Sequence, residues 1–281
     1  MVELSWSAAT VPDSRPMRMK TSVPPITSEA QTPESTFVPC ASTASLFLYA
    51  EGSAIVCLHH DTLAVERRFE NHTEDIGFIS VDNVSERGAG RLVVSYDVSQ
   101  TAVVWDLFTG SVIARFASFE QLKVAAWMRN GNIAFGNVKG DVILFEPSTS
   151  EHISCRTIFD PITALAPSSD CRTYAIGYQN GSILIATLHP TFTILHTMST
   201  SRGPSRIVSL AWHASSSKQK SDMLATLSAN GDLRVWSVAK PAGKDAPRVI
   251  RVLKRSDTSS TTEPKWMAWS KNGRIVQYLE G

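Results

Sequence analysis

The stretch Arg91–Gly110, RLVVSYDVSQTAVVWDLFTG, decides the fold of this chain. Its runs Leu92–Ser95 and Ala102–Asp106 flank a tight polar turn, and Gly110 closes the unit with a second turn. Apolar, β-branched runs bounded by Asp, Ser, Thr and Gly are typical of β-hairpins. The stretch therefore predicts two short antiparallel strands, the second of which carries Trp105 near its end.

This unit recurs along the chain with a period near 40 residues. Trp105, Phe145, Ala186 and Trp236 hold the same place, at spacings of 40, 41 and 50 residues. A polar insert at 215–221 explains the longer last interval. Repeats of this length with four strand-like runs are typical of propeller blades, which bury their faces only against neighbours, whereas a β-sandwich would not give this recurrence. Three further tryptophans are expected in the cores of inner strands: Trp127, Trp212 and Trp269.

The pair Trp105-Asp106 resembles the signature of WD40 repeats, each of which is one four-stranded propeller blade. The stretch Asn71–Ile76 resembles the Gly-His-Thr-x-x-Ile turn that opens such repeats, and Asn in place of Gly tolerates the left-handed conformation. The resemblance implies an all-β, WD40-type β-propeller of four-stranded antiparallel blades. We expect about five blades and a partial sixth that reaches Gly281.

The predicted domain boundary lies near residue 36. Residues 1–35 form a Pro/Ser/Thr-rich segment with few apolar residues, so we expect a disordered tail, followed by the propeller over 36–281. Three interpretations of the incomplete last blade stay open. The chain is a fragment of a seven-bladed propeller, which we favour; or N-terminal strands complete the last blade; or a partner covers its edge.

Composition limits the class of protein. The 281 residues are 43% apolar and 19% charged, with a net charge of +1, which is typical of a globular domain and argues against a strongly basic nucleic-acid surface. No apolar run is long enough to span a membrane, and no secretory signal is visible. We therefore expect a cytoplasmic or nuclear protein. The four cysteines have no paired spacing and are expected to be reduced, buried thiols: Cys40, Cys57, Cys155 and Cys171.

The WD40 resemblance also implies a buried hydrogen-bonded network that stiffens one blade. His72, Ser95 and Trp105 match three of its positions, and Asp97 is the candidate for the fourth. Asp97 lies eight residues before Trp105, where the family usually has six, and Ser99 occupies the six-residue position. For these residues we expect a structural role, and the other repeats, which lack the His, are expected to depend on apolar packing.

Motifs for catalysis or metal binding are weak. His59-His60-Asp61 suggests a metal site, but adjacent strand residues point to opposite faces, so a polar turn is the better interpretation. Cys57 lies in an apolar strand, which favours a core thiol over a nucleophile. The sequence has no Gly-rich phosphate loop and no Gly-x-Ser-x-Gly motif. We predict no enzyme activity, no cofactor or metal, and no small-molecule substrate.

The resemblance implies instead a scaffold that binds protein partners, as a subunit or adaptor of a larger intracellular complex. Such propellers typically bind through the rim formed by the loops that enter each blade and those between its second and third strands. The charges in these loops have mixed signs, which suits a protein better than a phosphate backbone. The residues predicted on this rim are Asp97, Glu120, Lys123, Lys139, Asp160, Gln179, Arg206, Asn230 and Lys265.

Two alternative ligands, membrane lipid and nucleic acid, are less well supported. Phosphoinositide-binding propellers carry a Phe-Arg-Arg-Gly-type motif, and this chain has Glu66–Glu70, ERRFE, with the aromatic on the other side and no Gly. The flanking glutamates would repel phosphate. The basic segment Arg248–Arg255 is the best candidate for nucleic-acid binding, although it also fits an outer strand and its loop.

Overall fold

The computed structural model describes residues 38–86, 88–200, 203–213, 219–241, 243, 245–253, 264, 266–270 and 272–278. The chain divides into two units, Met1–Thr36 and Phe37–Gly281. The predicted tail of residues 1–35 lies outside the described residues. Within them, all the regular elements of the second unit are β-strands. None of the described residues forms a helix of the length and apolarity that crossing a membrane requires.

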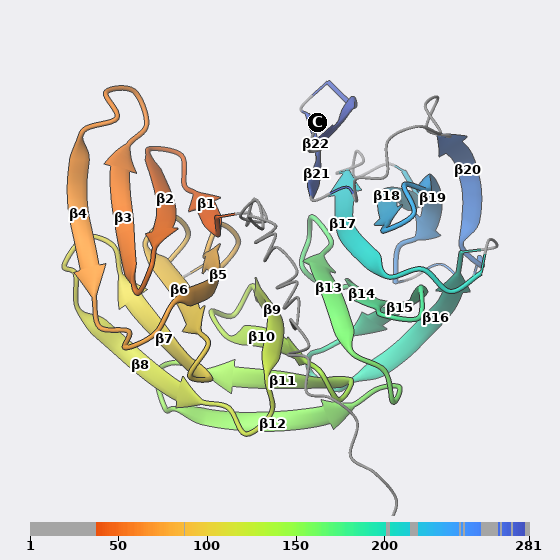
Figure 1. Cartoon of the computed structure of the whole chain (residues 1–281). Helices are drawn as coiled ribbons and strands as arrows, with labels where there is room; N and C mark the ends of the chain where they lie inside the picture. The colour runs from red at the N-terminus through yellow and green to blue at the C-terminus, as the bar shows by residue number, and fades with distance from the viewer. Residues whose placement is uncertain are drawn as a thin grey trace, which may run out of the picture. The chain divides into compact units, whose positions relative to one another are not determined.

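Among the described residues, the strands pair into five four-stranded antiparallel sheets and one two-stranded sheet, here called the first to sixth blades (Figure 1). The first blade contains β1 (Cys40–Ser42), β2 (Leu46–Glu51), β3 (Ala54–His59) and β4 (Val65–Glu70). The second contains β5 (Ile76–Val81), β6 (Leu92–Asp97), β7 (Thr101–Asp106) and β8 (Val112–Ala117). The third contains β9 (Leu122–Trp127), β10 (Ile133–Asn137), β11 (Asp141–Glu146) and β12 (Glu151–Arg156).

The remaining strands continue the same order. The fourth blade contains β13 (Ile162–Pro167), β14 (Tyr174–Tyr178), β15 (Ser182–Thr187) and β16 (Thr193–Ser199). The fifth contains β17 (Ile207–His213), β18 (Ser221–Ser228), β19 (Leu233–Ala239) and β20 (Arg248–Leu253), and the sixth contains β21 (Trp266–Trp269) and β22 (Ile275–Tyr278). This arrangement confirms the prediction of about five four-stranded blades and a partial one.

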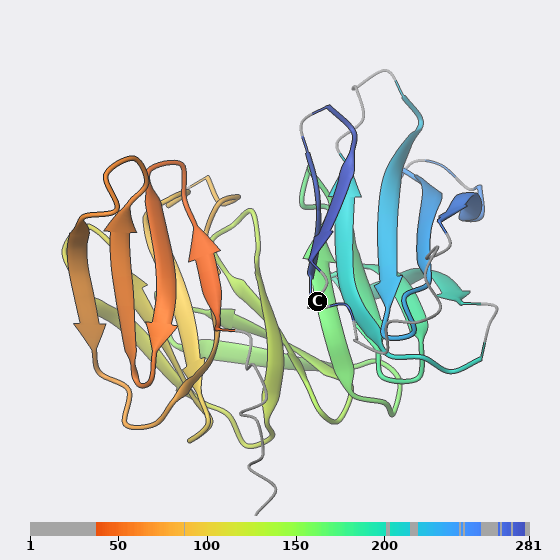
Figure 2. The same ribbon diagram turned by 45° about the horizontal axis from the view of Figure 1, so that its top comes forward.

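Each blade presents its first strand to the first strand of the next. β1, β5, β9, β13, β17 and β21 contact one another in this order, and the later strands of each blade lie further out (Figures 1 and 2). Because strand direction alternates within a blade, the loop that enters the blade and the turn between its second and third strands lie at one edge. We call this the entering edge, and the other the opposite edge.

Four blades share one register, which makes their residues directly comparable. The first residue of the inner strand pairs with a residue at the end of the second strand: Ile76 with Asp97, Leu122 with Asn137, Ile162 with Tyr178, and Ile207 with Ser228. Three residues further on, each turn has a residue with positive φ: Gln100, Gly140, Gly181 and Gly231. Trp105, Phe145, Ala186 and Trp236 then follow at the same distance, so the predicted 40-residue repeat corresponds to equivalent places in successive blades.

The apolar cores lie between blades. Trp105 packs with Leu48, Ile55 and Phe69 of the first blade, and the Trp105 and Phe69 rings meet edge to face at 5.3 Å between centroids. The predicted inner-strand tryptophans also join blades, because each indole Nε1 donates to a carbonyl oxygen of the preceding inner strand. These bonds run from Trp127 to Ser80 (2.9 Å), from Trp212 to Ala166 (3.1 Å) and from Trp269 to Ala211 (2.9 Å). Trp127 is buried, whereas the other two are half-buried.

One expectation needs correction. All four cysteines are free, as expected, but only Cys57 is buried. In the first blade, the Thr43 hydroxyl oxygen accepts the N–H of Leu46 at 2.9 Å in the turn after Cys40–Ser42, and Leu63, which has a φ of 54°, lies in the turn before Val65.

Candidate functional site

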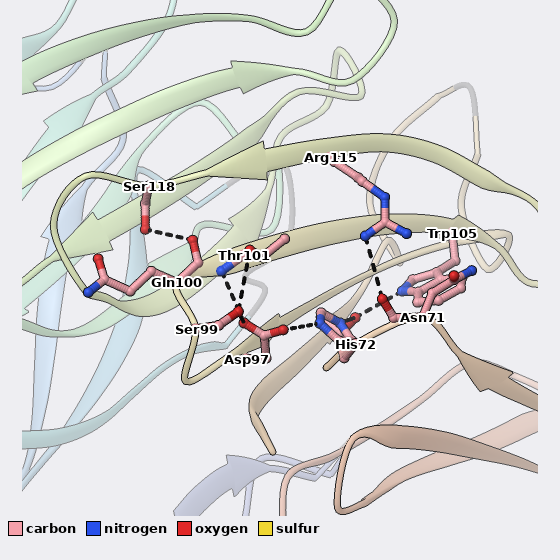
Figure 3. A network of polar contacts seen from close by, with 10 residues as sticks. Asn71, His72, Asp97, Ser99, Gln100, Thr101, Trp105, Arg115 and Ser118 are labelled. Atoms are coloured by element: carbon pink, nitrogen blue, oxygen red, sulfur yellow. Dashed lines mark hydrogen bonds and ion pairs between the residues drawn. The ribbon is translucent and has the colours of Figure 1, made fainter. Parts of the chain in front are cut away.

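The structure brings His72, Ser95, Asp97 and Trp105 together in one chain of hydrogen bonds inside the second blade. Figure 3 shows His72, Asp97 and Trp105 of this chain. The distance from His72 Nδ1 to Asp97 Oδ2 is 2.7 Å, and that from His72 Nε2 to Ser95 Oγ is 2.7 Å. Trp105 Nε1 donates to Ser95 Oγ at 2.9 Å. The loop before β5 supplies His72, β6 supplies the Ser and Asp, and β7 supplies the Trp, so the network joins the entering loop to two adjacent strands of one blade.

The bonds have one consistent direction. An ionised Asp97 only accepts, so His72 Nδ1 carries the proton, and Nε2 then accepts the hydroxyl proton of Ser95. The same hydroxyl oxygen accepts the indole N–H of Trp105. With a neutral imidazole, both ring nitrogens, the Ser95 hydroxyl and the Trp105 indole N–H therefore all have hydrogen-bond partners. Protonation of Nε2 would leave Ser95 without an acceptor for its proton in this chain.

The electrostatics agree with this assignment. Burial lowers the pKa of His72 overall, although Asp97 acts in the opposite direction and Arg115 adds to the lowering. Burial by itself would raise the pKa of Asp97, but hydrogen bonds from Ser99, His72 and the Thr101 N–H lower it overall. We infer a neutral histidine beside an ionised aspartate near pH 7.

Ser99 has the usual six-residue spacing before Trp105, but in the structure it binds Asp97. Its hydroxyl donates to Asp97 Oδ1 at 2.6 Å, and the N–H of Thr101 donates to the same oxygen at 3.1 Å (Figure 3). Asp97 therefore accepts from His72 with one oxygen and closes the β6–β7 turn with the other. Ser99 supports the aspartate and does not replace it.

Ser95, His72 and Asp97 are connected in the same order as a Ser-His-Asp catalytic triad, but their surroundings differ. Ser95 and Asp97 are 0% and 1% exposed, and the side chain of His72 is 1% exposed. The Ser95 oxygen also already accepts the Trp105 N–H. A substrate carbonyl would have no access to Ser95 Oγ, so in this structure the arrangement can connect strands but cannot attack a substrate.

The equivalent positions of the third and fourth blades do not carry this network. In the third blade, Phe135 and Phe145 lie where the second has Ser95 and Trp105. The Phe135 ring stacks on Phe116 with centroids 5.7 Å apart, and the Phe145 ring is tilted against Phe116 at 5.1 Å. In the fourth blade, Ile176 and Ala186 hold these places. Apolar contacts thus replace polar bonds at these sites.

The residues predicted on the rim have different environments. Asp97 is buried in the network and does not form part of the surface. Lys123 is the bulged residue of β9 and is exposed. Lys139, Gln179 and Asn230 are exposed in turns between second and third strands, and Glu120, Asp160 and Arg206 are half-buried in entering loops. Lys265 lies outside the described residues.

Two exposed phenylalanines at the entering edge were not among the residues predicted on the rim. Phe119 is 96% exposed and Phe159 is 84% exposed. Each lies three residues before the equivalent residues Leu122 and Ile162 that begin inner strands. Their spacing of 40 residues matches the blade period and could have identified them as equivalent, although it does not distinguish exposed positions from core positions.

The weaker sequence motifs are explained by local structure. His59 ends β3, and its Nδ1 accepts the N–H of Asp61 at 3.3 Å, so the His59-His60-Asp61 motif forms a turn. Arg67 donates to the carbonyl oxygens of Phe108 and Thr109 in the second blade. Arg68 pairs with Glu51 and Glu70. The basic segment near residue 250 forms the outer strand β20 as far as Leu253, and residues 254–255 lie outside the described residues.

Comparisons with known proteins identify the class of fold. The sequence matches no protein-family model and no curated protein. The β-propeller domain of Cps50 (Swd1) from Myceliophteria thermophila is similar in structure, with a TM-score of 0.69 and 13% identity over 86% of this chain and 79% of that one. A chain in the crystal structure of a mitotic checkpoint complex has a TM-score of 0.68 and 17% identity, over 88% of this chain and 73% of that one. With the repeated four-stranded sheets, these likenesses confirm the predicted β-propeller fold of four-stranded antiparallel blades.

Proposed function

We propose that this chain is a non-catalytic scaffold that binds protein partners at its entering edge. The observation that carries the proposal is the near-complete exposure of Phe119 and Phe159 on that edge. Exposed aromatic rings are costly in water and are enriched in the cores of protein interfaces. One solved structure with this fold is that of a mitotic checkpoint complex, which supports a role in an assembly.

The absence of catalysis is part of the proposal. The arrangement closest to catalytic geometry is the Ser95–His72–Asp97 chain, and it is buried with the serine oxygen already occupied. Its bonds connect the strands of the second blade, which is a structural role.

Lipid binding receives less support from the contacts. The guanidinium groups of Arg67 and Arg68, the candidates for a lipid motif, are both hydrogen-bonded to acceptors within the protein. Binding phosphate would require these bonds to be broken. A protein partner requires no such rearrangement.

The test is chemical cross-linking of the tagged chain in cells that express it, followed by mass spectrometry of the captured complex. We expect a stoichiometric partner cross-linked to Lys123 or Lys139, which are exposed at or near the entering edge. Lys240, in the loop after β19 at the opposite edge, is the internal control. Recovery of the chain alone, or cross-links confined to Lys240, would contradict the proposal.

A further inference from the structure

Phe119 and Phe159 belong to a motif that the entering edge presents twice. Each phenylalanine is followed by an acidic residue, Glu120 in one case and Asp160 in the other. The two pairs enter the third and fourth blades, whose inner strands β9 and β13 contact each other. Equivalent places in adjacent blades therefore display the same combination of an exposed ring and a carboxylate.

The loop that carries Phe159 is held firmly. The N–H of Thr157 donates to Gly140 O at 3.1 Å, Tyr178 Oη donates to Thr157 Oγ1 at 2.6 Å, and the N–H of Asn180 donates to Asp160 Oδ2 at 2.8 Å. Gly140 has a φ of 84°, and a Cβ there would lie 1.8 Å from the carbonyl oxygen of Ile158. Only glycine permits this close approach.

The Phe159 ring and the backbone on either side of Phe119 are also held in place. The guanidinium carbon of Arg156 lies 5.0 Å from the centre of the Phe159 ring, and Arg156 Nε pairs with Asp141 Oδ1 at 2.8 Å. On the other loop, the N–H of Ser118 donates to Gln100 O at 2.9 Å, and the N–H of Leu122 donates to Tyr96 Oη at 3.0 Å, so both ends of the Phe119 segment are attached to the second blade. A ring and a loop backbone that are already held in place cost less to order on binding.

The balance of charge around these rings is negative. The entering loops 71–75, 118–121 and 157–161 contain Glu74, Asp75, Glu120 and Asp160, and their sequences contain no Lys or Arg. The cations next to these loops are Lys123, Lys139 and Arg115, which donates to Asn71 O at 3.5 Å, together with Arg156, which is already paired with Asp141. Counting the two lysines and Arg115 against the four carboxylates leaves one carboxylate in excess. The next entering loop ends in Arg206, so the acidic character does not extend to the fifth blade.

We infer that this surface, defined by Glu74, Asp75, Phe119, Glu120, Phe159 and Asp160, binds a protein segment that combines large apolar side chains with lysine or arginine. The apolar side chains pack on the two rings, and the basic groups lie next to the carboxylates. A phosphate backbone would be repelled by the same carboxylates. The inference rests on the proposed scaffold function, because it specifies the partner of that same edge.

The test uses a phage-displayed library of random linear peptides selected on the whole chain. We expect enrichment of sequences rich in both Lys or Arg and Leu, Phe or Trp. Affinity of a synthetic selected peptide should fall by about tenfold or more in the double variant Phe119→Ala, Phe159→Ala. The matched control is Phe108→Ala, which removes a 64% exposed phenylalanine from the β7–β8 turn at the opposite edge and should leave the affinity unchanged.

The charge is tested separately with Glu120→Gln combined with Asp160→Asn, which keeps an oxygen acceptor for the Asn180 N–H. This variant should weaken binding by roughly several-fold and reduce its dependence on salt, whereas Glu151→Gln, at the opposite edge, should not. Acidic selected peptides, peptides that bind the phenylalanine variant as well as the parent, or failure to enrich any sequence would each overturn the inference. The scaffold function would then still be decided by the cross-linking experiment, which does not depend on these rings.

Discussion

The second and fifth blades place a tryptophan at the same point of the third strand, but they support it differently. Trp105 is 1% exposed and donates its indole N–H to Ser95, and Trp236 is 7% exposed and donates to Thr226 Oγ1 at 3.1 Å. Ser95 and Thr226 occupy equivalent positions, two residues before the end of the second strand. To this point the two blades are alike.

Beyond the hydroxyl group they diverge. In the second blade the chain of bonds continues to His72 and Asp97. In the fifth blade the equivalent positions hold Gly203 and Ser228. Ser228 Oγ is buried and has no hydrogen-bond partner among the described residues. One blade geometry is therefore compatible with a complete or a truncated network, so the shared register and apolar packing define the blade, and the polar chain adds to its stability.

The largest expected effect is the loss of Trp105. Trp105→Ala removes a buried ring packed on Phe69 and leaves Ser95 without the indole donor, so we expect the free energy of unfolding to fall by about 3–5 kcal/mol. Trp236→Ala should cost about 1 kcal/mol less, because that ring is more exposed and its network is shorter. Denaturant unfolding measures both losses. A loss below about 1 kcal/mol for Trp105 would contradict its place in the core.

The second expected effect is a pH dependence specific to the complete network. An unfolded histidine titrates near pH 6.5, and burial lowers the pKa of His72 in the fold. Below about pH 6.5 the unfolded chain therefore binds a proton that the folded chain does not. The contribution of His72 to the free energy of unfolding is complete above that pH. As the pH falls from there to the lowered pKa of His72, the contribution declines by at most about 1.4 kcal/mol per pH unit. The lowered pKa of Asp97 adds a further loss only below about pH 3.9.

The measurement compares unfolding of the parent chain and of His72→Gln between about pH 7.5 and about pH 5.5. The variant should be less stable at the higher pH and should lose less stability on acidification. The fifth blade has Gly203 at this position and makes no such contribution. The other six histidines are present in both the parent chain and the variant, so their contributions to the pH dependence cancel. Equal losses in the two proteins would show that His72 does not titrate differently on folding.

The same comparison explains why the fold could be predicted from the sequence. The turn residues and the strands next to them recur locally, so the period from Trp105 to Phe145 identified the blades without any long-range information. The network was harder to assign, because its bonds depend on which residues face each other across strands. Asp97 pairs with Ile76 and lies beside the loop of His72, which the spacing from Asp97 to Trp105 along the chain does not reveal.

The exposed phenylalanines could not be predicted for a different reason. A 40-residue spacing identifies Phe119 and Phe159 as equivalent, but Phe135 and Phe145 show that phenylalanines of the same chain are also fully buried. Exposure depends on the path of the entering loop, which is set by contacts such as that of Gly140 with the carbonyl of Ile158. These contacts are between segments whose proximity is not apparent in the sequence.

The smallest expected effect tests the truncated network itself. Ser228→Ala removes a buried hydroxyl group that lacks a partner among the described residues, so its desolvation penalty disappears. We expect the free energy of unfolding to stay within error or to rise by up to about 1 kcal/mol. Asp97→Ala at the equivalent position should instead cost about 2–4 kcal/mol, because the N–H of His72, the hydroxyl of Ser99 and the N–H of Thr101 lose their acceptor. Both are measured by denaturant unfolding, and a loss above about 1 kcal/mol for Ser228→Ala would show that this hydroxyl makes a stabilising bond and that the fifth blade has a polar network of its own.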